Sequence, residues 1–402
     1  MMRNRFGLVT SVAFAAAGVA GIAAIASIPT VTFVRLGATS TPPVLAELGV
    51  PHQPTPEPMY AIYMTQCAVG TPSLRDSLVQ LIDTTKLNAV VIDIKDYTGR
   101  IAFPTDNPAL ASSVSDKCGA DDMKEFVAML HEKDIYVIGR ITVFQDPNYT
   151  KLHPEQSVQS KSRPGEPWKD YKGLSFVAVN AEPYWEYIIE LSKESYALGF
   201  DELNYDYVRW PSDGPMSDVV YPSVDRAGEL EKFFQYLHAK VKPIGVAMSA
   251  DLFGMTTTNF DDLNIGQVLE RTLPYFDYVA PMVYPSHYPK GFLGLSNPNN
   301  DTYRVVNYSM SEAVKRAIAT TTSVTSLVHT RIGTSSPAIY QKPWHDPKKL
   351  RPWLQDFDYG KDYLPADILD QTRATYDAGL TSWYFWDPAN RYTSLRQVLL
   401  EQ

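Results

Sequence analysis

The stretch Phe200-Asp201-Glu202-Leu203-Asn204-Tyr205-Asp206-Tyr207-Val208-Arg209-Trp210-Pro211 decides the fold. Large apolar or aromatic residues alternate with short polar ones, so a strand here turns Asn204 and Asp206 to one side. Pro211 ends the strand because it has no backbone N–H. Such a strand either faces water or lines a closed barrel with a polar site at its mouth.

The flanking sequence favours the barrel, because strand and helix signals alternate along the chain. The segment 87–94 is a nearly continuous apolar run, which is typical of a parallel strand buried on both faces. We predict eight strands, the seventh of them weakly signalled, within 60–65, 87–94, 135–144, 200–211, 244–253, 278–284, 350–357 and 380–386. A helix is expected after each strand, the one after the fifth strand over 265–273, whereas 320–345 has no clear pattern.

Eight strand-helix units predict an α/β protein with a (β/α)8 TIM barrel. The alternative is a doubly wound open sheet. That fold would need a glycine-rich phosphate loop after its first strand, and Thr65-Gln66-Cys67-Ala68-Val69-Gly70 is not one.

The N-terminus predicts export. Arg3 and Arg5 precede a segment without charge until Arg35, and residues 7–28 are long enough to cross a bilayer. We interpret residues 1–35 as a membrane anchor. A cleaved signal peptide is the alternative, because Ala24-Ile25-Ala26 resembles a cleavage site.

The rest of the chain follows as a linker and one domain. Residues 36–58 are rich in Pro and Thr and predict a tether, and 59–402 form the barrel. We therefore expect an extracytoplasmic protein held at the membrane, or secreted if the segment is cleaved. Cys67 and Cys118 fall on one face of that barrel and either pair or stay free.

Composition narrows the function. The 402 residues are 45% hydrophobic and 20% charged, as in an ordinary globular protein, and the net charge is -9. An acidic chain argues against nucleic acid as a partner. The seven histidines are never within a helical turn of one another, and neither a metal-ligand motif nor a nucleotide loop is present, so no metal or cofactor is expected.

Candidate site residues are those at the predicted strand exits, where barrel enzymes carry their chemistry. Acids dominate there, and two carboxylates are the minimum machinery for cleaving a glycosidic bond. We assign catalysis to Asp206 and Asp251, although Asp251 has a structural alternative. The expected substrate-binding residues are Asp93, Lys95, Arg140, Asn204, Arg209, Tyr284, His287, Trp386 and Asp387. For Asp93 a structural role is equally well supported, and Asp387-Pro388 also reads as a turn.

Six segments together resemble a bacterial family of glycoside hydrolases over about residues 58–395: Val90–Asp96, Ile138–Phe144, Phe200–Pro211, Ala280–Tyr288, Arg351–Phe357 and Trp383–Asp387. The resemblance implies a TIM barrel distantly similar to α-amylase-like and α-galactosidase-like enzymes, and it supports the weak seventh strand. It also implies that Asp206, on the fourth strand, is the nucleophile. The fifth strand of the α-amylase-like enzymes usually ends in a Glu acid/base, where this chain has Asp251.

We therefore expect a glycosidase that acts on a cell-surface or extracellular polysaccharide. Two alternatives stay open: a barrel that binds carbohydrate without cleaving it, and another polysaccharide hydrolase such as a deacetylase.

Overall fold

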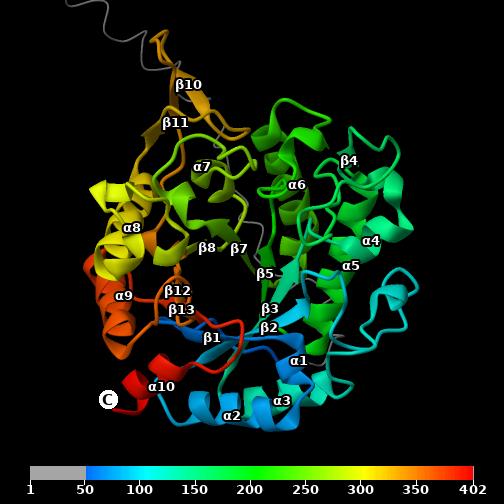
Figure 1. Cartoon of the computed structure of the whole chain (residues 1–402), viewed down its shortest axis with the longest axis vertical. Helices are drawn as coiled ribbons and strands as arrows, with labels where there is room; N and C mark the ends of the chain where they lie inside the picture. Colours follow the sequence, from blue (N-terminus) through cyan, green and yellow to red (C-terminus); the bar gives the residue numbers. More distant parts are fainter. Residues whose placement is uncertain (1–50, 402) are drawn as a thin grey trace, which may run out of the picture. The chain divides into compact units, whose positions relative to one another are not determined.

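The computed structural model describes residues 51–401, and within them eight parallel strands close into a barrel in the order β1-β13-β12-β8-β7-β5-β3-β2 (Figure 1). This confirms the predicted TIM barrel, with its weak seventh strand present as a short β12. The strands are β1 (Tyr60–Met64), β2 (Ala89–Lys95), β3 (Tyr136–Thr142), β5 (Glu202–Asp206), β7 (Ala247–Phe253), β8 (Tyr278–Met282), β12 (Trp353–Gln355) and β13 (Trp383–Trp386).

The predicted anchor and most of the linker lie outside the described residues. Within 51–401, no helix is both long and apolar enough to span a bilayer.

Helices surround the strands on the outside of the barrel (Figure 1). They are α1 (Gln66–Val69), α2 (Pro72–Asp83), α3 (Met123–Glu132), α4 (Pro147–Leu152), α5 (Glu182–Leu198), α6 (Arg226–Val241), α7 (Leu269–Thr272), α8 (Thr302–Ile318), α9 (Pro365–Asp377) and α10 (Thr393–Leu400). The helix expected over 265–273 is only the four-residue α7. It starts late because Leu263, Asn264 and Gly266 have positive φ angles, which a helix cannot contain.

The unassigned region 320–345 forms a small antiparallel sheet beside the short α7. Its strands are β9 (Thr321–Thr322), β10 (Thr330–Ile332) and β11 (Ile339–Gln341), and a second small sheet joins β4 (Gln159–Ser160) to β6 (Val219–Val220). Val324 forms a small apolar cluster with Ala227 and Val268. Glu231 of α6 accepts hydrogen bonds from Ser326 Oγ and from Leu327 N–H. The segment therefore packs onto α6 and the residues that precede α7.

The strands separate two apolar regions. Leu203 and Tyr205 belong to the large core between strands and helices, whereas Val91, Ile138 and Trp353 pack in a second cluster inside the barrel. The alternation predicted for the segment that forms β5 is therefore correct, because its apolar residues face the helices.

The N-terminal segment of the domain packs against the amino ends of the strands. Gln53 N–H donates to Asp201 Oδ1 at 2.7 Å, and Thr55 Oγ1 lies 3.0 Å from the Tyr136 hydroxyl. Burial alone would raise the pKa of Asp201, but hydrogen bonds from His131 and the Val137 N–H, together with the nearby His52 ring, outweigh it and lower the pKa. The chain thus enters at the barrel end opposite to the strand exits.

A disulfide joins the two cysteines, which the sequence had left open. It links Cys67 of α1 to Cys118, in the loop between β2 and α3. The two backbones meet closely, because a Cβ on Gly70 would lie 2.2 Å from the Gly119 carbonyl oxygen. The disulfide therefore fixes this loop against the exit of β1.

Replacing either cysteine with serine should destabilise the protein. The crosslinked residues are 51 positions apart, and closing a loop of that length stabilises a fold by up to about 4 kcal/mol. Cys67→Ser, Cys118→Ser and the double variant should lose the same free energy of unfolding in denaturant titrations, since each removes one crosslink. A double variant that loses the sum of the single losses, or nothing, would contradict this.

Candidate active site

Four charged side chains from adjacent strands meet inside the barrel. Asp93 is on β2, Arg140 on β3, Asp206 ends β5, and Asp251 is on β7. Asp93 and Arg140 are direct partners in the strand register. All four side chains are nearly fully buried. The sequence predicted each of them, and the structure brings them together.

Arg140 lies at the centre of this cluster. Its Nη1 donates to Asp93 Oδ1 at 2.5 Å, and its Nε and Nη2 both donate to Asp206 Oδ2, at 3.1 and 2.5 Å. Asp206 Oδ2 and Asp251 Oδ2 lie 3.1 and 3.9 Å from the same atom, Arg140 Nε, so the two oxygens cannot be more than 7.0 Å apart. Retaining glycosidases hold their carboxyl groups about 5–5.5 Å apart and inverting ones about 6.5–9.5 Å. A distance of at most 7.0 Å between these two oxygens is compatible with a retaining or an inverting mechanism.

Asp251 is positioned through one oxygen. Its Oδ1 accepts hydrogen bonds from Asn204 Nδ2 at 2.9 Å and from Trp353 Nε1 at 2.8 Å. Its Oδ2 has no hydrogen bond within the described residues. Burial, and next the charge of Asp206, raise the pKa of Asp251 well above its ordinary value, against the smaller effect of Arg140. Both effects disfavour the charged form of Asp251, and Oδ2 is the oxygen without a hydrogen bond.

Asp93 adjoins an aromatic wall. Tyr63 donates its hydroxyl hydrogen to Asp93 Oδ2, and burial raises the pKa of Asp93 to about 6. The Tyr63 ring stacks on Trp386 with centroids 3.7 Å apart. Arg140 lies 5.0 Å from the centre of the half-buried Trp386 ring. The predicted residue Trp386 therefore belongs to the cluster.

Two predicted residues lie further along the rim. Tyr284 is buried inside the barrel, and its ring centre is 5.6 Å from that of the exposed His287. Both pack edge-on against Phe357. His287 is thus joined to the interior through aromatic contacts, without a hydrogen bond to the carboxylates.

Lys95 and Asp387 were assigned to the site, and the structure places both elsewhere. The register of β2 shifts between Asp93 and Lys95, so these residues do not share a face. Lys95 is instead buried against α5, where its Nζ lies 2.8 Å from Asp146 Oδ2 and 3.2 Å from the Tyr184 hydroxyl. The Asp387 carboxylate accepts backbone N–H groups of 389, 391 and 392, so it holds the turn before α10.

Arg209 lies beside the cluster, among aromatic rings. Its guanidinium carbon is 4.8 Å from the ring centres of both Tyr207 and Phe253. Tyr207 directly follows Asp206 in sequence and has a positive φ of 50°. This turn re-aims the chain at the exit of β5.

The sequence did not identify Tyr63 or Trp353 as site residues. Each follows an alternating pattern from the start of its strand, but buried aromatic residues in barrels usually only fill the core. The sequence signal for these two residues is their position in the alternation of each strand, which turns Tyr63 and Trp353 into the barrel interior.

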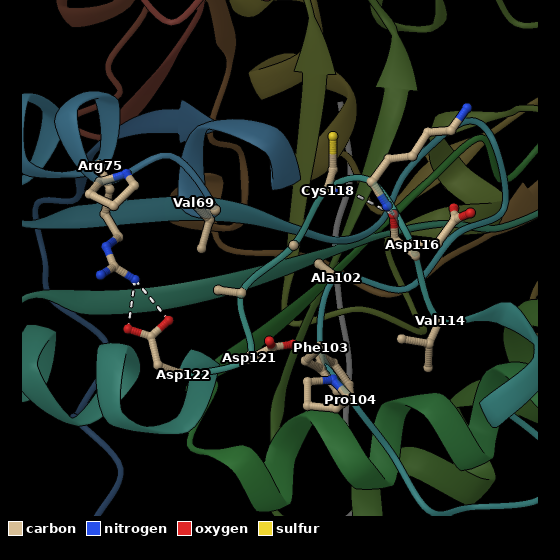
Figure 2. Close-up of a pocket in the computed structure, with 16 residues that line it drawn as sticks. Val69, Arg75, Ala102, Phe103, Pro104, Val114, Asp116, Cys118, Asp121 and Asp122 are labelled. Atoms are coloured by element: carbon tan, nitrogen blue, oxygen red, sulfur yellow. Dashed lines mark hydrogen bonds and ion pairs between the residues drawn. The ribbon is translucent and has the colours of Figure 1, made fainter.

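A cavity of about 390 Å³ lies away from these carboxylates, beside the disulfide (Figure 2). Residues of the β2–α3 loop line it together with the start of α2. The Arg75 guanidinium spans its edge to Asp122, with N···O distances of 3.0 Å. Asp122 is the N-cap residue of α3, but its side chain binds Arg75 and makes no capping hydrogen bond.

In residues 51–401 no group of three or more His, Cys, Asp or Glu side chains is arranged to hold a metal ion. The expectation that the protein needs no metal or cofactor stays a prediction.

A closed barrel with carboxylates at its strand exits is the architecture of TIM-barrel glycoside hydrolases. Residues 61–392 match the family described as "putative glycosyl hydrolase domain", and the chain belongs to this family. This confirms the resemblance seen in the sequence. A search of curated proteins finds no match.

Solved structures share the fold at low identity. The glycoside hydrolase domain of PgaB (BpsB) from Bordetella bronchiseptica is 15% identical with a TM-score of 0.57, covering 85% of this chain and 99% of that one. α-L-Fucosidase isoenzyme 2 from Paenibacillus thiaminolyticus is 10% identical with a TM-score of 0.56, covering 86% and 49%. An α-galactosidase from Thermus thermophilus is 12% identical with a TM-score of 0.50, covering 85% and 63%.

Replacing Arg140 with glutamine should destabilise the fold in a pH-dependent way. Removing one partner of a buried ion pair costs about 3–5 kcal/mol. The loss should be smaller at pH 5 than at pH 7.5. Asp93 already has a pKa raised to about 6, so a buried carboxyl left without arginine is relieved by protonation as the pH falls. Unfolding free energies of wild type and variant at both pH values test this.

Arg373→Gln is the matched control, since it breaks the exposed pair with Asp370 on α9. It should change stability by less than about 1 kcal/mol at either pH. An Arg140→Gln loss that is equal at both pH values would contradict the role given to Arg140.

Proposed function

We propose that this protein hydrolyses glycosidic bonds with Asp206 as nucleophile or base and Asp251 as acid. One observation carries the proposal: two carboxyl groups from neighbouring strands have oxygens no more than 7.0 Å apart, and Arg140 donates two hydrogen bonds to Asp206 but lies 3.9 Å from Asp251. Pairs of carboxyl groups with opposed environments are how glycosidases divide acid and nucleophile roles.

The contacts favour this division of roles. Arg140 donates two hydrogen bonds to Asp206 and so places its positive charge directly beside this carboxyl group. Asp206 Oδ1 is held by the Tyr207 N–H rather than by arginine, so it is the oxygen that would attack the sugar or activate water. Asp251 has a raised pKa and an unbonded Oδ2, which suits protonation of the leaving oxygen.

Neighbouring residues would orient the substrate and the carboxyl groups. Asn204 and Trp353 fix Asp251, and Asp93 balances the charge of Arg140. Trp386 would offer a flat face to a sugar ring. Tyr284 and His287 would extend this aromatic surface along the rim.

We further propose that the substrate is an extracytoplasmic polysaccharide, with the protein anchored or secreted through residues 1–35. The disulfide supports an oxidising compartment. The uncharged N-terminal segment supports export on sequence grounds.

A second candidate is a barrel that binds glycans without cleaving them. The pairing of Arg140 with both Asp93 and Asp206 favours it, because arginine bound to a carboxylate lowers its nucleophilicity. In that case glycan binding would survive Asp206→Asn, and wild type would release no reducing ends from any polysaccharide tested.

Asp206→Asn and Asp251→Asn should each abolish cleavage. Loss of a nucleophile or of proton donation to a poor leaving group lowers kcat/KM by at least about a hundredfold. Reducing-end release from a polysaccharide panel measures it, with thermal melting as the check on folding. Asp76→Asn, on the exposed surface of α2, is the control and should keep full activity. If both site variants cleave at the wild-type rate, the assignment is wrong.

The leaving group separates the two roles. In an aryl glycoside of an acidic phenol, the phenolate leaves without being protonated. Asp251→Asn should therefore lose much less kcat/KM on such an aryl glycoside than on the natural glycan. Asp206→Asn should lose both activities, because attack at the sugar is still required. Equal losses of the two variants on both substrate types would exclude Asp251 as the acid.

A further inference from the structure

Arg209 stands apart from the other buried arginines of residues 51–401. Four arginine side chains there are buried, and Arg140, Arg316 and Arg351 each pair with a carboxylate. Arg209 is only 6% exposed, yet no carboxylate oxygen lies within ion-pair distance of it in the described chain. Its one hydrogen bond runs from Nη1 to the Trp210 carbonyl oxygen at 2.9 Å.

The aromatic rings around Arg209 account for only part of its burial. Tyr207 and Phe253 lie 4.8 Å from the guanidinium and Phe176 lies 5.6 Å away. A cation over a ring is stabilised by about 0.5–2 kcal/mol, whereas an isolated buried charge costs several. Rings contact the faces of the guanidinium, and Nη1 donates to the Trp210 carbonyl oxygen. Nε and Nη2 are not among the fully buried polar atoms that have no partner, so their N–H groups can meet a ligand.

The ring contacts place the guanidinium of Arg209 near the ends of the two strands that carry the candidate catalytic groups. Tyr207 follows Asp206 directly, and Phe253 is two residues after Asp251 at the end of β7. The guanidinium therefore lies between the exits of β5 and β7. Burial lowers the pKa of Arg209, while Tyr207, Asp206, Asp213 and Asp170 oppose that effect. None of the three carboxylates forms an ion pair with it in the described chain. An anionic group on a bound substrate would supply the ion-pair partner that Arg209 lacks.

We propose that Arg209 recognises a carboxylate on the sugar next to the cleaved bond, so that the substrate is an acidic, uronate-containing glycan. The inference rests on the proposed function. A guanidinium fork binds a carboxylate through two parallel N–H···O bonds, which neutral sugars cannot offer. The net charge of -9 repels acidic glycans at long range, so their recognition requires a local cation such as Arg209.

Calorimetry with matched trisaccharides tests the proposal. The probes are trigalacturonate, its carboxyl-reduced neutral form, and a sulfated form of that neutral trisaccharide. Wild type should bind trigalacturonate at least about tenfold tighter than the neutral sugar, the difference of one good charged hydrogen-bond pair. Arg209→Gln should remove this preference, so that the variant binds trigalacturonate and the neutral sugar equally well, with thermal melting as the check that it folds. Arg209→Lys should restore only part of it, because it keeps charge but loses the fork.

Arg75→Gln, beside the remote cavity, is the control and should keep the wild-type preference. Equal wild-type affinity for acidic and neutral sugars would overturn the proposal even if Arg209→Gln failed to fold. Tighter binding of the sulfated sugar than of trigalacturonate would overturn the choice of carboxylate. If the protein cleaves neutral glycans in an Asp206-dependent way and shows no preference for acidic sugars, it is a glycosidase but the role given to Arg209 is wrong. If it binds acidic sugars through Arg209 and cleaves no glycan, the role of Arg209 holds but the proposed hydrolysis is wrong.

Discussion

The pairing of Arg140 with Asp93 and Asp206 is the interaction on which the interior of this barrel depends. One guanidinium joins the side chains of three adjacent strands at the point where they exit. Burying several carboxyl groups together is unfavourable unless a cation balances them. Burial is the largest cause of the raised pKa of Asp251. Arg140 binds Asp93 and Asp206 directly but lies 3.9 Å from Asp251, so Asp251 receives the least compensation for that burial.

The fold could be predicted from the sequence because parallel strands are continuous apolar runs and their order follows the chain. The four-residue cluster could be predicted too, since polar residues inside such runs are costly to bury. What could not be predicted was the face to which a strand-end residue points. A single register shift in β2 turns Lys95 toward α5, and a tight turn uses up the Asp387 carboxylate. Neither feature leaves a periodic signal.

The irregular parts of the outer layer escaped prediction for a related reason. The segment 320–345 is rich in threonine and serine and lacks a repeating apolar pattern, so its strands are specified by contacts with distant residues such as Glu231. The same holds for Trp353, whose indole N–H binds Asp251 across 102 positions of sequence. Contacts of this kind depend on barrel closure and cannot be derived from local spacing.

The entry of the chain at the amino ends of the strands has a consequence for access to the carboxyl groups. Gln53 and Thr55 are bound at that end, while the carboxyl groups sit at the other. The described N-terminal segment therefore packs on the barrel face remote from the strand exits and does not stand between these carboxyl groups and an approaching ligand.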